Sequence, residues 1–211
     1  MDVLARLDAA RAATDVLQHP FYQRWSAGEL SGEELALYAG QYRHAVLALA
    51  DASDGAAAVA TGSHAAGLAR HAEEEAAHVE LWDAFASACG SEPGAAPLSG
   101  TAECVASWCA GEDLLERLAV LYAIEASQPA ISQTKLEGLR AHYVEVREGP
   151  ATEYFELHAV RDVEHADAAA ELIAELMPAG EAGREQADRM VARAEAALRG
   201  NWSLLDSVEA S

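Results

Sequence analysis

Residues 154–165 read YFELHAVRDVEH and lie within a segment, 152–176, that we interpret as one long helix ended by the proline and glycine after it. In a helix, positions i, i+4 and i+7 lie on one face. His158, Asp162 and His165 have this spacing, so two imidazoles and one carboxylate are expected to project to the same side. Such a donor set suits a borderline divalent metal such as iron. The alternative is a solvated polar stripe, because short motifs recur by chance.

A second predicted helix, over 63–89, contains the pair Glu75 and His78. Helical di-iron carboxylate proteins use this E-x-x-H spacing to aim two ligands inward. Glu74 is a competing carboxylate next to the pair, and His71, two turns before His78, can face the same way. The alternative is an acidic helix face in contact with solvent, which is the usual role of a glutamate-rich run.

A single carboxylate, Glu125, ends the otherwise apolar run 118–126. Burying a carboxylate is costly unless another group compensates its charge. A salt bridge from Lys135 or Arg117 is the structural explanation, and a metal ion is the functional one.

Together, three predicted helices supply six ligand-type side chains at inward positions. They are Glu75, His78, Glu125, His158, Asp162 and His165. Six protein ligands are too many for one tetrahedral zinc ion. They suit two metal ions that share a bridging carboxylate and keep open positions, and open positions on iron are where O2 binds. The sequence therefore predicts a di-iron centre that activates oxygen.

The rest of the chain has the composition of a helical protein. Ala, Leu and Glu dominate its 211 residues, and only 6% are aromatic, which favours helix over sheet. Further helices are predicted at 2–17, 31–60, 101–110, 112–126, 130–146 and 181–205, with a loop at 91–100 rich in Pro, Gly and Ser. Ser31 and Glu34 form a capping box at the start of one of them. We therefore expect an all-α fold, a single-domain bundle of about seven helices over 1–211.

Charge and cysteine content limit the partners and the location. The net charge of -21 argues against nucleic acids and anionic membranes, since both require clustered Lys and Arg. No signal pattern opens the chain, and no apolar run approaches the ~20 residues that span a bilayer. Cys89, Cys104 and Cys109 form no CxxC pair and are interpreted as buried thiols in a reducing compartment. We expect a cytoplasmic protein with a small-molecule substrate, no nucleic-acid or membrane partner, and a homodimer as one option for its assembly.

Segments along nearly the whole chain resemble the haem-oxygenase-like di-iron oxidases and oxygenases, in the wider group of the TenA and PqqC folds. They lie at 19–30, 38–42, 75–82, 121–125, 135–139 and 154–165, and the last is fairly specific for the metal-binding branch. The resemblance implies a haem-oxygenase-like, TenA-like helical bundle. It also implies two Fe(II) ions, or an Fe/Mn pair, as cofactor and O2 as co-substrate.

Within that family the chain is most similar to the chlamydial protein associating with death domains and its bacterial relatives. These are implicated in forming para-aminobenzoate for folate, with an internal tyrosine as ring source and an internal lysine as amino donor. The matching positions are Tyr22 and Lys135, which with Tyr42 become candidate catalytic residues. Packing is the alternative role for the tyrosines, and an ion pair for the lysine. The relatives have about one helical turn more between the first ligand Glu and its His, so the choice between Glu74 and Glu75 stays open.

Three other functions remain as alternatives. A metal-independent, TenA-like hydrolase of thiamin-derived pyrimidines needs an activated cysteine near a carboxylate, and no cysteine lies beside the tyrosines in the sequence. Sister branches oxidise free amino acids in natural-product biosynthesis on the same ligand set. An iron-holding protein without enzymatic activity is the third, although no duplicated E-x-x-H of the ferritin kind is evident.

Overall fold

Helices account for all regular structure in the computed structural model, which describes residues 2–91, 94–146 and 148–211. The α-helices are α1 (Val3–Ala13), α2 (Pro20–Ala27), α3 (Gly32–Val59), α4 (Ala65–Ala88), α5 (Ser99–Trp108), α6 (Leu114–Glu125), α7 (Gln128–His142), α8 (Glu153–Leu176) and α9 (Gly180–Glu209). Short 3-10 turns lie at Val16–Gln18, Gly62–His64, Val144–Val146 and Gly149–Ala151. The predicted all-α class is confirmed, and the described residues form more helices than the approximate number expected.

Local sequence explains where two of these helices begin. The capping box before α3 is confirmed: the Ser31 hydroxyl accepts from the Glu34 amide at 3.2 Å, and the Glu34 carboxylate accepts from the Ser31 amide at 2.8 Å. The sequence pattern did not indicate α2, a helix of two turns. It begins with Pro20 at its first position, and the His19 ring accepts a hydrogen bond from the Phe21 amide in place of the usual Ser, Thr or Asp cap.

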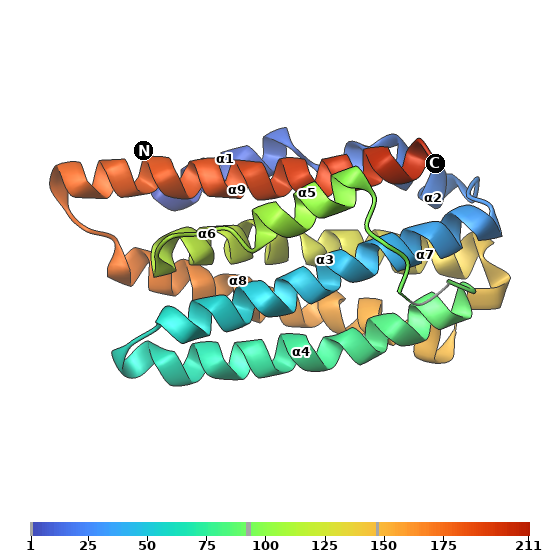
Figure 1. Ribbon diagram of the computed structural model, residues 1–211, viewed down its shortest axis with the longest axis horizontal. Helices are drawn as coiled ribbons and strands as arrows, with labels where there is room; N and C mark the ends of the chain where they lie inside the picture. The colour runs from blue at the N-terminus through green and yellow to red at the C-terminus, as the bar shows by residue number, and fades with distance from the viewer. Residues whose placement is uncertain (1, 92–93, 147) are drawn as a thin grey trace.

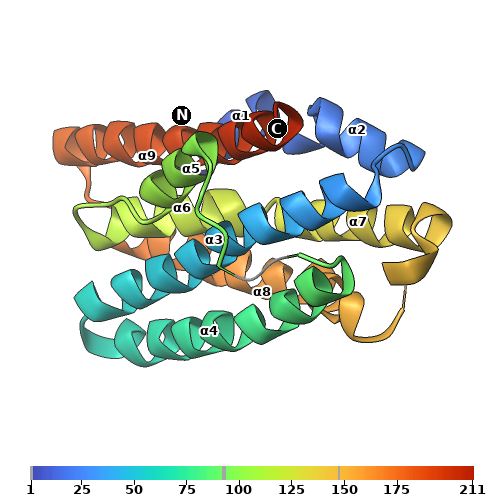
Figure 2. The same cartoon turned by 45° about the vertical axis from the view of Figure 1, so that its right-hand side comes forward.

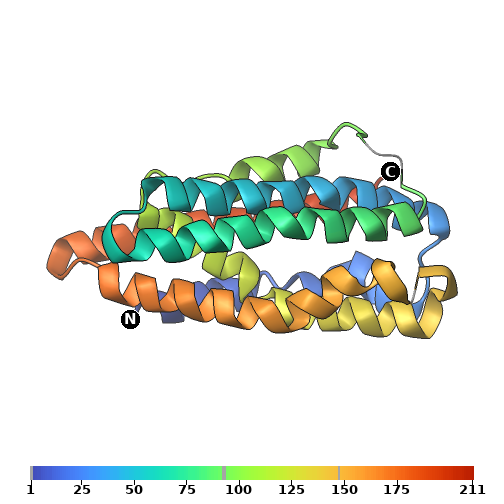
Figure 3. The ribbon, with the colours of Figure 1, turned by 90° about the horizontal axis from the view of Figure 1, so that it is seen from below.

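The long helices run along one axis and form two layers. Figure 1 shows α9 and α4 at opposite edges of the molecule, with α3, α6 and α8 between them. From below, α3 and α4 lie side by side in one layer and α8 runs in the layer facing them (Figure 3). Helix α2 packs on α7 at one end of the bundle (Figure 2). The face of α4 that is turned toward α8 and α6 is therefore an interior face.

The core divides into an aromatic part and an aliphatic part. The aromatic part contains Trp25, Tyr38, Trp82 and Phe85, all fully buried where α2, α3, α4 and α7 meet. The aliphatic part joins α1, α6, α8 and α9 through small and branched side chains. Close packing of this kind fixes the helices that carry the polar residues described below.

Gly28 shows how tightly the α2 end is packed. It closes α2 in the left-handed conformation, with a φ of 71°, and a Cβ there would lie 2.5 Å from the His142 ring. Both the backbone angle and the space therefore require glycine.

Two further expectations are tested by the described residues. No helix among them combines the length and the apolar character needed to cross a membrane. The three cysteines are free thiols, with Cys104 buried and the other two half-buried. Of the loop predicted at 91–100, residues 92–93 lie outside the described residues, and Ser99 already belongs to α5.

Candidate metal centre

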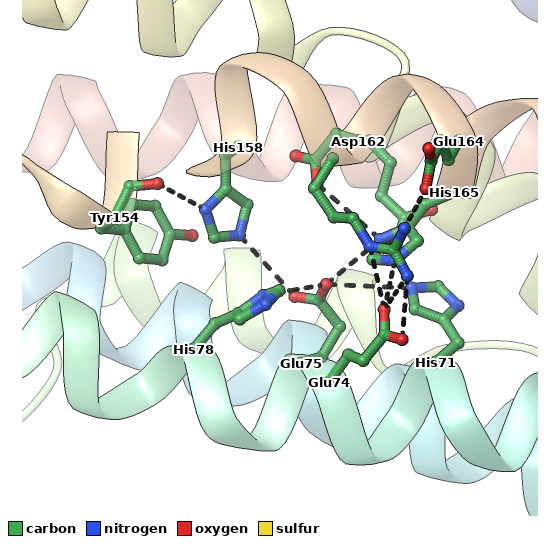
Figure 4. A network of polar contacts seen from close by, with 11 residues as sticks. His71, Glu74, Glu75, His78, Tyr154, His158, Asp162, Glu164 and His165 are labelled. Atoms are coloured by element: carbon green, nitrogen blue, oxygen red, sulfur yellow. Dashed lines mark hydrogen bonds and ion pairs between the residues drawn. The ribbon is translucent and has the colours of Figure 1, made fainter. Parts of the chain in front are cut away.

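Helix α4 turns a row of polar side chains into the interior. His71, Glu75 and His78 follow one another at i, i+4 and i+7, and Figure 4 shows them pointing from α4 toward α8. Glu75 and His78 are buried, and Trp82 continues the row one turn later as a buried ring. The apolar positions of α4 share this face, so the helix cannot bury its core side without also burying these ligand-type groups.

Helices α8 and α6 complete the cluster from the other side. His158, Asp162 and His165 point from α8 toward α4, as their spacing predicted, and all three are buried (Figure 4). Glu125, at the end of α6, has no exposed surface at all. The structure thus brings all six predicted ligands into one buried cluster built from three helices.

The donor atoms form two groups that share one residue. One group contains His71, Glu75, Glu125 and His165, the other Glu75, His78 and His158, and within each group the donor atoms lie within 4.8 Å of one another. Glu75 Oε1 lies 3.2 Å from His78 Nδ1 and 3.3 Å from His165 Nδ1, and Glu75 Oε2 lies 4.0 Å from His158 Nε2. Glu75 is therefore the carboxylate placed between two possible ion positions.

The polar atoms of this cluster lack the partners that buried groups normally have. Among the described residues, nine buried side-chain atoms without a hydrogen-bond partner belong to seven of its side chains. They are one nitrogen each of His71, His78, His158 and His165, Glu75 Oε1, and both oxygens of Glu125 and Asp162. Unsatisfied buried polar atoms are costly and rare. Bound cations would satisfy all nine, so the donor set fits a metal centre.

Hydrogen bonds outside the cluster hold two of the imidazoles in the orientation of metal ligands. The Nδ1–H of His158 donates to the Tyr154 carbonyl at 2.7 Å, which leaves Nε2 free to face Glu75. The Nε2–H of His165 donates to the Glu74 carboxylate at 3.0 Å, which leaves Nδ1 facing the cluster. Ligand histidines in metal sites are commonly held by a carbonyl or carboxylate in this way.

The two neighbouring glutamates of α4 therefore have different surroundings. Glu75 is 3% exposed and faces the cluster, whereas Glu74 is 33% exposed and binds the guanidinium of Arg161 as well as His165. The geometry favours Glu75 as the ligand and Glu74 as the residue that orients a ligand.

Asp162 lies at the edge of the cluster. Its Oδ1 lies 3.8 Å from His165 Nδ1, and it belongs to neither group of mutually close donor atoms. Burial, followed by the charges of Glu125 and Glu75, raises the pKa of Asp162 to about 9. Without a cation nearby, this carboxyl group therefore holds a proton at neutral pH.

The charges of the other cluster residues are coupled. Burial opposes ionisation of Glu75, but the neighbouring imidazoles of His158, His165 and His78 hold its pKa well below the usual range. Burial likewise opposes the charged form of His165, yet Glu75 and Glu125 together raise its pKa to about 9. Metal binding must therefore displace protons from this cluster.

The three predicted catalytic residues lie together in a second buried region, which we call the lysine pocket. Lys135 Nζ, on α7, lies 4.4 Å from the centre of the Tyr42 ring and 5.6 Å from that of Tyr22. It also faces the rings of Tyr38, Trp82 and Phe155 at 5.3 to 5.5 Å. Nζ has no hydrogen-bond partner in the part of the chain that the structure describes, and burial lowers the pKa of Lys135 to about 7.

The structure contradicts the ion pairs considered for Glu125. Neither Lys135 nor Arg117 pairs with it, and its neighbours are the imidazoles of His71, at 2.7 Å, and His165, at 3.9 Å. Lys135 instead points into the aromatic core, where its Nζ faces rings from α2, α3, α4 and α8.

Aromatic rings separate the lysine pocket from the metal cluster. Tyr154 stacks on the His158 ring with centroids 3.9 Å apart, and Trp82 meets Tyr154 edge-on at 4.9 Å. Trp82 in turn lies 4.9 Å from Tyr42. On the tyrosine side, the Tyr22 and Tyr38 hydroxyls lie 3.1 Å apart, and both rings are fully buried.

A cavity of about 430 Å³ leads from the surface to the metal cluster. His71 and His165 are among its lining residues, together with Glu74 and Arg161. The sequence did not indicate the ion pair of Glu74 with Arg161 or the Tyr154 carbonyl, because such contacts join separate helices or use the backbone. The position of His71 was open in the sequence, and its i−4 spacing from Glu75 is the signal that points inward.

Comparison with known proteins adds to this geometry. Residues 36–202 match the profile of a haem-oxygenase-like family described as iron-containing redox enzymes. A 4-aminobenzoate synthase of Chlamydia muridarum is 29% identical, covering 98% of this chain and 90% of its own length. A 4-aminobenzoate synthase of Nitrosomonas europaea is 28% identical, covering 96% and 89%.

Solved structures confirm the predicted haem-oxygenase-like fold. A domain of unknown function from Shewanella denitrificans, described as having a heme oxygenase-like fold, superposes with a TM-score of 0.79 at 20% identity and covers 100% of this chain and 93% of that one. A TenA homologue from Pseudomonas syringae gives a TM-score of 0.80 at 18% identity, with coverage of 99% and 91%.

Proposed function

Since the chain belongs to the haem-oxygenase-like family of iron-containing redox enzymes, and is an iron-dependent oxidoreductase, we propose that it binds two Fe(II) ions and reacts with O2. The observation that carries the proposal is the group of nine unsatisfied donor atoms around one shared carboxylate, Glu75. The proposed ligands are the six predicted ones: Glu75, His78, Glu125, His158, Asp162 and His165. An Fe/Mn pair is compatible with the same donors.

Iron supplies the oxygen activation, and the protein supplies ligand geometry and protection from water. Glu75 holds the two positions together from α4. The Tyr154 carbonyl and the Glu74 carboxylate keep the free ring nitrogens of His158 and His165 turned inward. Tyr154, stacked on His158, closes the side of the cluster that faces the aromatic core.

For the product we propose 4-aminobenzoate, formed with Tyr22 as ring source and Lys135 as amino donor. Support comes from the names of the relatives and from the lysine pocket. In that product the lysine nitrogen would replace the phenol oxygen of Tyr22, so the ring C–O and the Lys135 Cε–Nζ bonds would break and the oxygen would leave as water. The Tyr22 Cα–Cβ bond would break as well, with O2 as the oxidant that converts Cβ to the carboxylate. An amine needs its lone pair to form the new C–N bond, and a pKa of about 7 for Lys135 leaves a large neutral fraction at neutral pH. Tyr42, whose ring lies nearest to the amine, would hold it in position.

One observation favours a second candidate, the oxidation of a free amino acid. The cavity that reaches His71 and His165 carries cationic side chains, Arg70 and Arg161, beside anionic ones such as Glu74 and Glu175. Such a lining suits a small zwitterion that enters from outside. In this case Tyr22 and Lys135 would stay unmodified.

The cysteine chemistry of a TenA-like hydrolase has no support in the geometry. Burial raises the pKa of the Cys89 thiol to about 12 and raises that of Cys104 further, so both are protonated at neutral pH. Neither belongs to the groups of possible metal donors among the described residues.

The proposal is tested by an anaerobic Fe(II) titration of metal-free protein, followed by exposure to O2 and mass spectrometry. We expect saturation at about two irons per chain, a strong loss in His158→Ala, and no change in His44→Ala, whose ring lies outside the cluster. Formation of 4-aminobenzoate with a mass change at Tyr22 would support the internal route. Product from an added amino acid, with Tyr22 intact, would favour the second candidate, and absence of saturable binding would refute the di-iron centre.

A further inference from the structure

His71 is the one imidazole of the cluster that is not among the six proposed ligands. It lies one helical turn before Glu75 on the inward face of α4 (Figure 4), and its side chain is 13% exposed. Its ring centroid is 4.1 Å from that of His165, and its Nε2 is 2.7 Å from Glu125 Oε1 and 3.9 Å from Glu75 Oε1.

The contact between His71 and Glu125 does not have the geometry of a hydrogen bond. Although the two atoms are only 2.7 Å apart, neither has a hydrogen-bond partner among the described residues, because the angles between the two groups do not suit a hydrogen bond. Two donors bound at right angles to one ion, with bonds of about 2.1 Å, lie about 3 Å apart. The separation and the misalignment are those of two atoms that face the same point in space.

We propose that His71 is a seventh metal ligand. With His165, Glu125 and the shared Glu75 it forms one position of two imidazoles and two carboxylates, whereas His78 and His158 with Glu75 form the other. The inference rests on the proposed iron pair. It gives the two ion positions different sets of protein ligands.

The position that contains His71 has more protein donors than the position of His78 and His158. Asp162 lies on the same side of the cluster as His71, because it contacts His165. It should therefore take up the first ion. The position of His78 and His158 has fewer protein donors, lies beside the stacked ring of Tyr154, and retains more open coordination sites.

The cavity gives a way to test the role of His71 from outside. His71 and His165 are among its described lining residues, and His78 and His158 are not. A small ligand such as imidazole can therefore reach the space that a truncated His71 side chain would leave.

The experiment is an anaerobic Fe(II) titration of the wild type, His71→Ala, His71→Gln and the control His64→Ala, each with and without added imidazole. His64 also lines the cavity but pairs with Glu175, outside the cluster. We expect the affinity for one of the two ions to fall at least about 10-fold in both His71 variants. Imidazole should restore it in His71→Ala, and His64→Ala should match the wild type.

The glutamine variant separates a ligand from a hydrogen-bond donor. Its amide can donate to Glu125 but binds iron poorly, so wild-type affinity in His71→Gln would overturn the inference. Two bound ions in the wild type with unchanged affinity in His71→Ala would also overturn it and leave the iron pair intact. Failure of the wild type to bind two ions would overturn the iron pair and, with it, this inference. Circular dichroism of each metal-free variant checks that the bundle has folded.

Discussion

The metal cluster and the lysine pocket both lie in the interior of the bundle, and they differ in how their charge is compensated. In the cluster, imidazoles and carboxylates form two groups that share Glu75, with the donor atoms of each group within 4.8 Å of one another, and nine buried atoms have no hydrogen-bond partner among the described residues. In the pocket, one amine faces five aromatic rings, and no carboxylate of the described residues lies within ion-pair distance of it. Several donor atoms close together raise the affinity for cations, whereas apolar surroundings lower the pKa of an isolated amine. One bundle thus contains a candidate cation site and an amine of lowered pKa, separated by the rings of Trp82 and Tyr154.

The largest effect is expected from the residue that both metal positions share. Glu75→Ala removes the carboxylate between the two groups, so iron binding should fall from two ions per chain to fewer than one. Iron analysis after desalting measures the number of irons that remain bound per chain. Retention of both ions would show that the groups do not depend on a common carboxylate.

Lys135→Met should change the pocket and leave the cluster unchanged. The variant should bind two irons, form no 4-aminobenzoate, and be more stable than the wild type near neutral pH, because burial of the amine costs free energy whenever the unfolded chain is protonated. Loss of iron binding in this variant would show that the two regions are not independent.

The pH dependence of that stability difference follows from the sign of the pKa shift. The pKa of Lys135 is lowered from 10.5 to about 7 by burial, so between these values the unfolded chain binds more protons than the folded one. Wild-type stability should therefore rise relative to Lys135→Met by about 1.4 kcal/mol per pH unit from pH 7 to pH 10. Below pH 7 the difference should be constant. Urea unfolding of both metal-free proteins measures it, and a pH-independent difference would mean that the amine stays charged.

A smaller effect is expected beside the cluster. Glu74→Gln weakens the hold on His165 and on Arg161 but removes no proposed ligand. Iron affinity should fall about 10-fold to 100-fold, as for other residues that orient a metal ligand. Paired with Glu75→Ala, this variant compares adjacent carboxylates, and equal losses would contradict their different assignments.

The smallest effect is expected at the rim of the pocket. Tyr42→Phe removes the hydroxyl that accepts a hydrogen bond from Gln128 at 3.1 Å, and leaves a buried amide unsatisfied. Stability should fall by about 1–3 kcal/mol, measured by urea unfolding, with iron binding unchanged. Reduced iron affinity would link Tyr42 to the cluster.

Sequence spacing predicted most of the cluster because its residues lie on long, regular helices. His158, Asp162 and His165 share a face of α8 at any reasonable helix boundary, and Glu125 stood out as a lone carboxylate in an apolar run. The same regularity predicted the all-α fold. The two-turn helix α2 was not predicted, because a histidine caps it.

The lysine pocket and the roles of His71 and Glu74 could not be predicted in this way. The rings around Lys135 come from α2, α3, α4 and α8, and no periodicity within one segment reveals that they meet. The choice between Glu74 and Glu75 depends on the rotation of α4 against α8, which packing of the whole bundle determines. Prediction from one sequence therefore ends where a contact joins separate helices.

The central claim, two iron ions that share Glu75, is tested most directly by a crystal structure of protein loaded anaerobically with Fe(II). Anomalous scattering at the iron edge should show two peaks between α4, α6 and α8, both bonded to the Glu75 carboxylate. A single peak, or two peaks of which one lies away from Glu75, would contradict the claim.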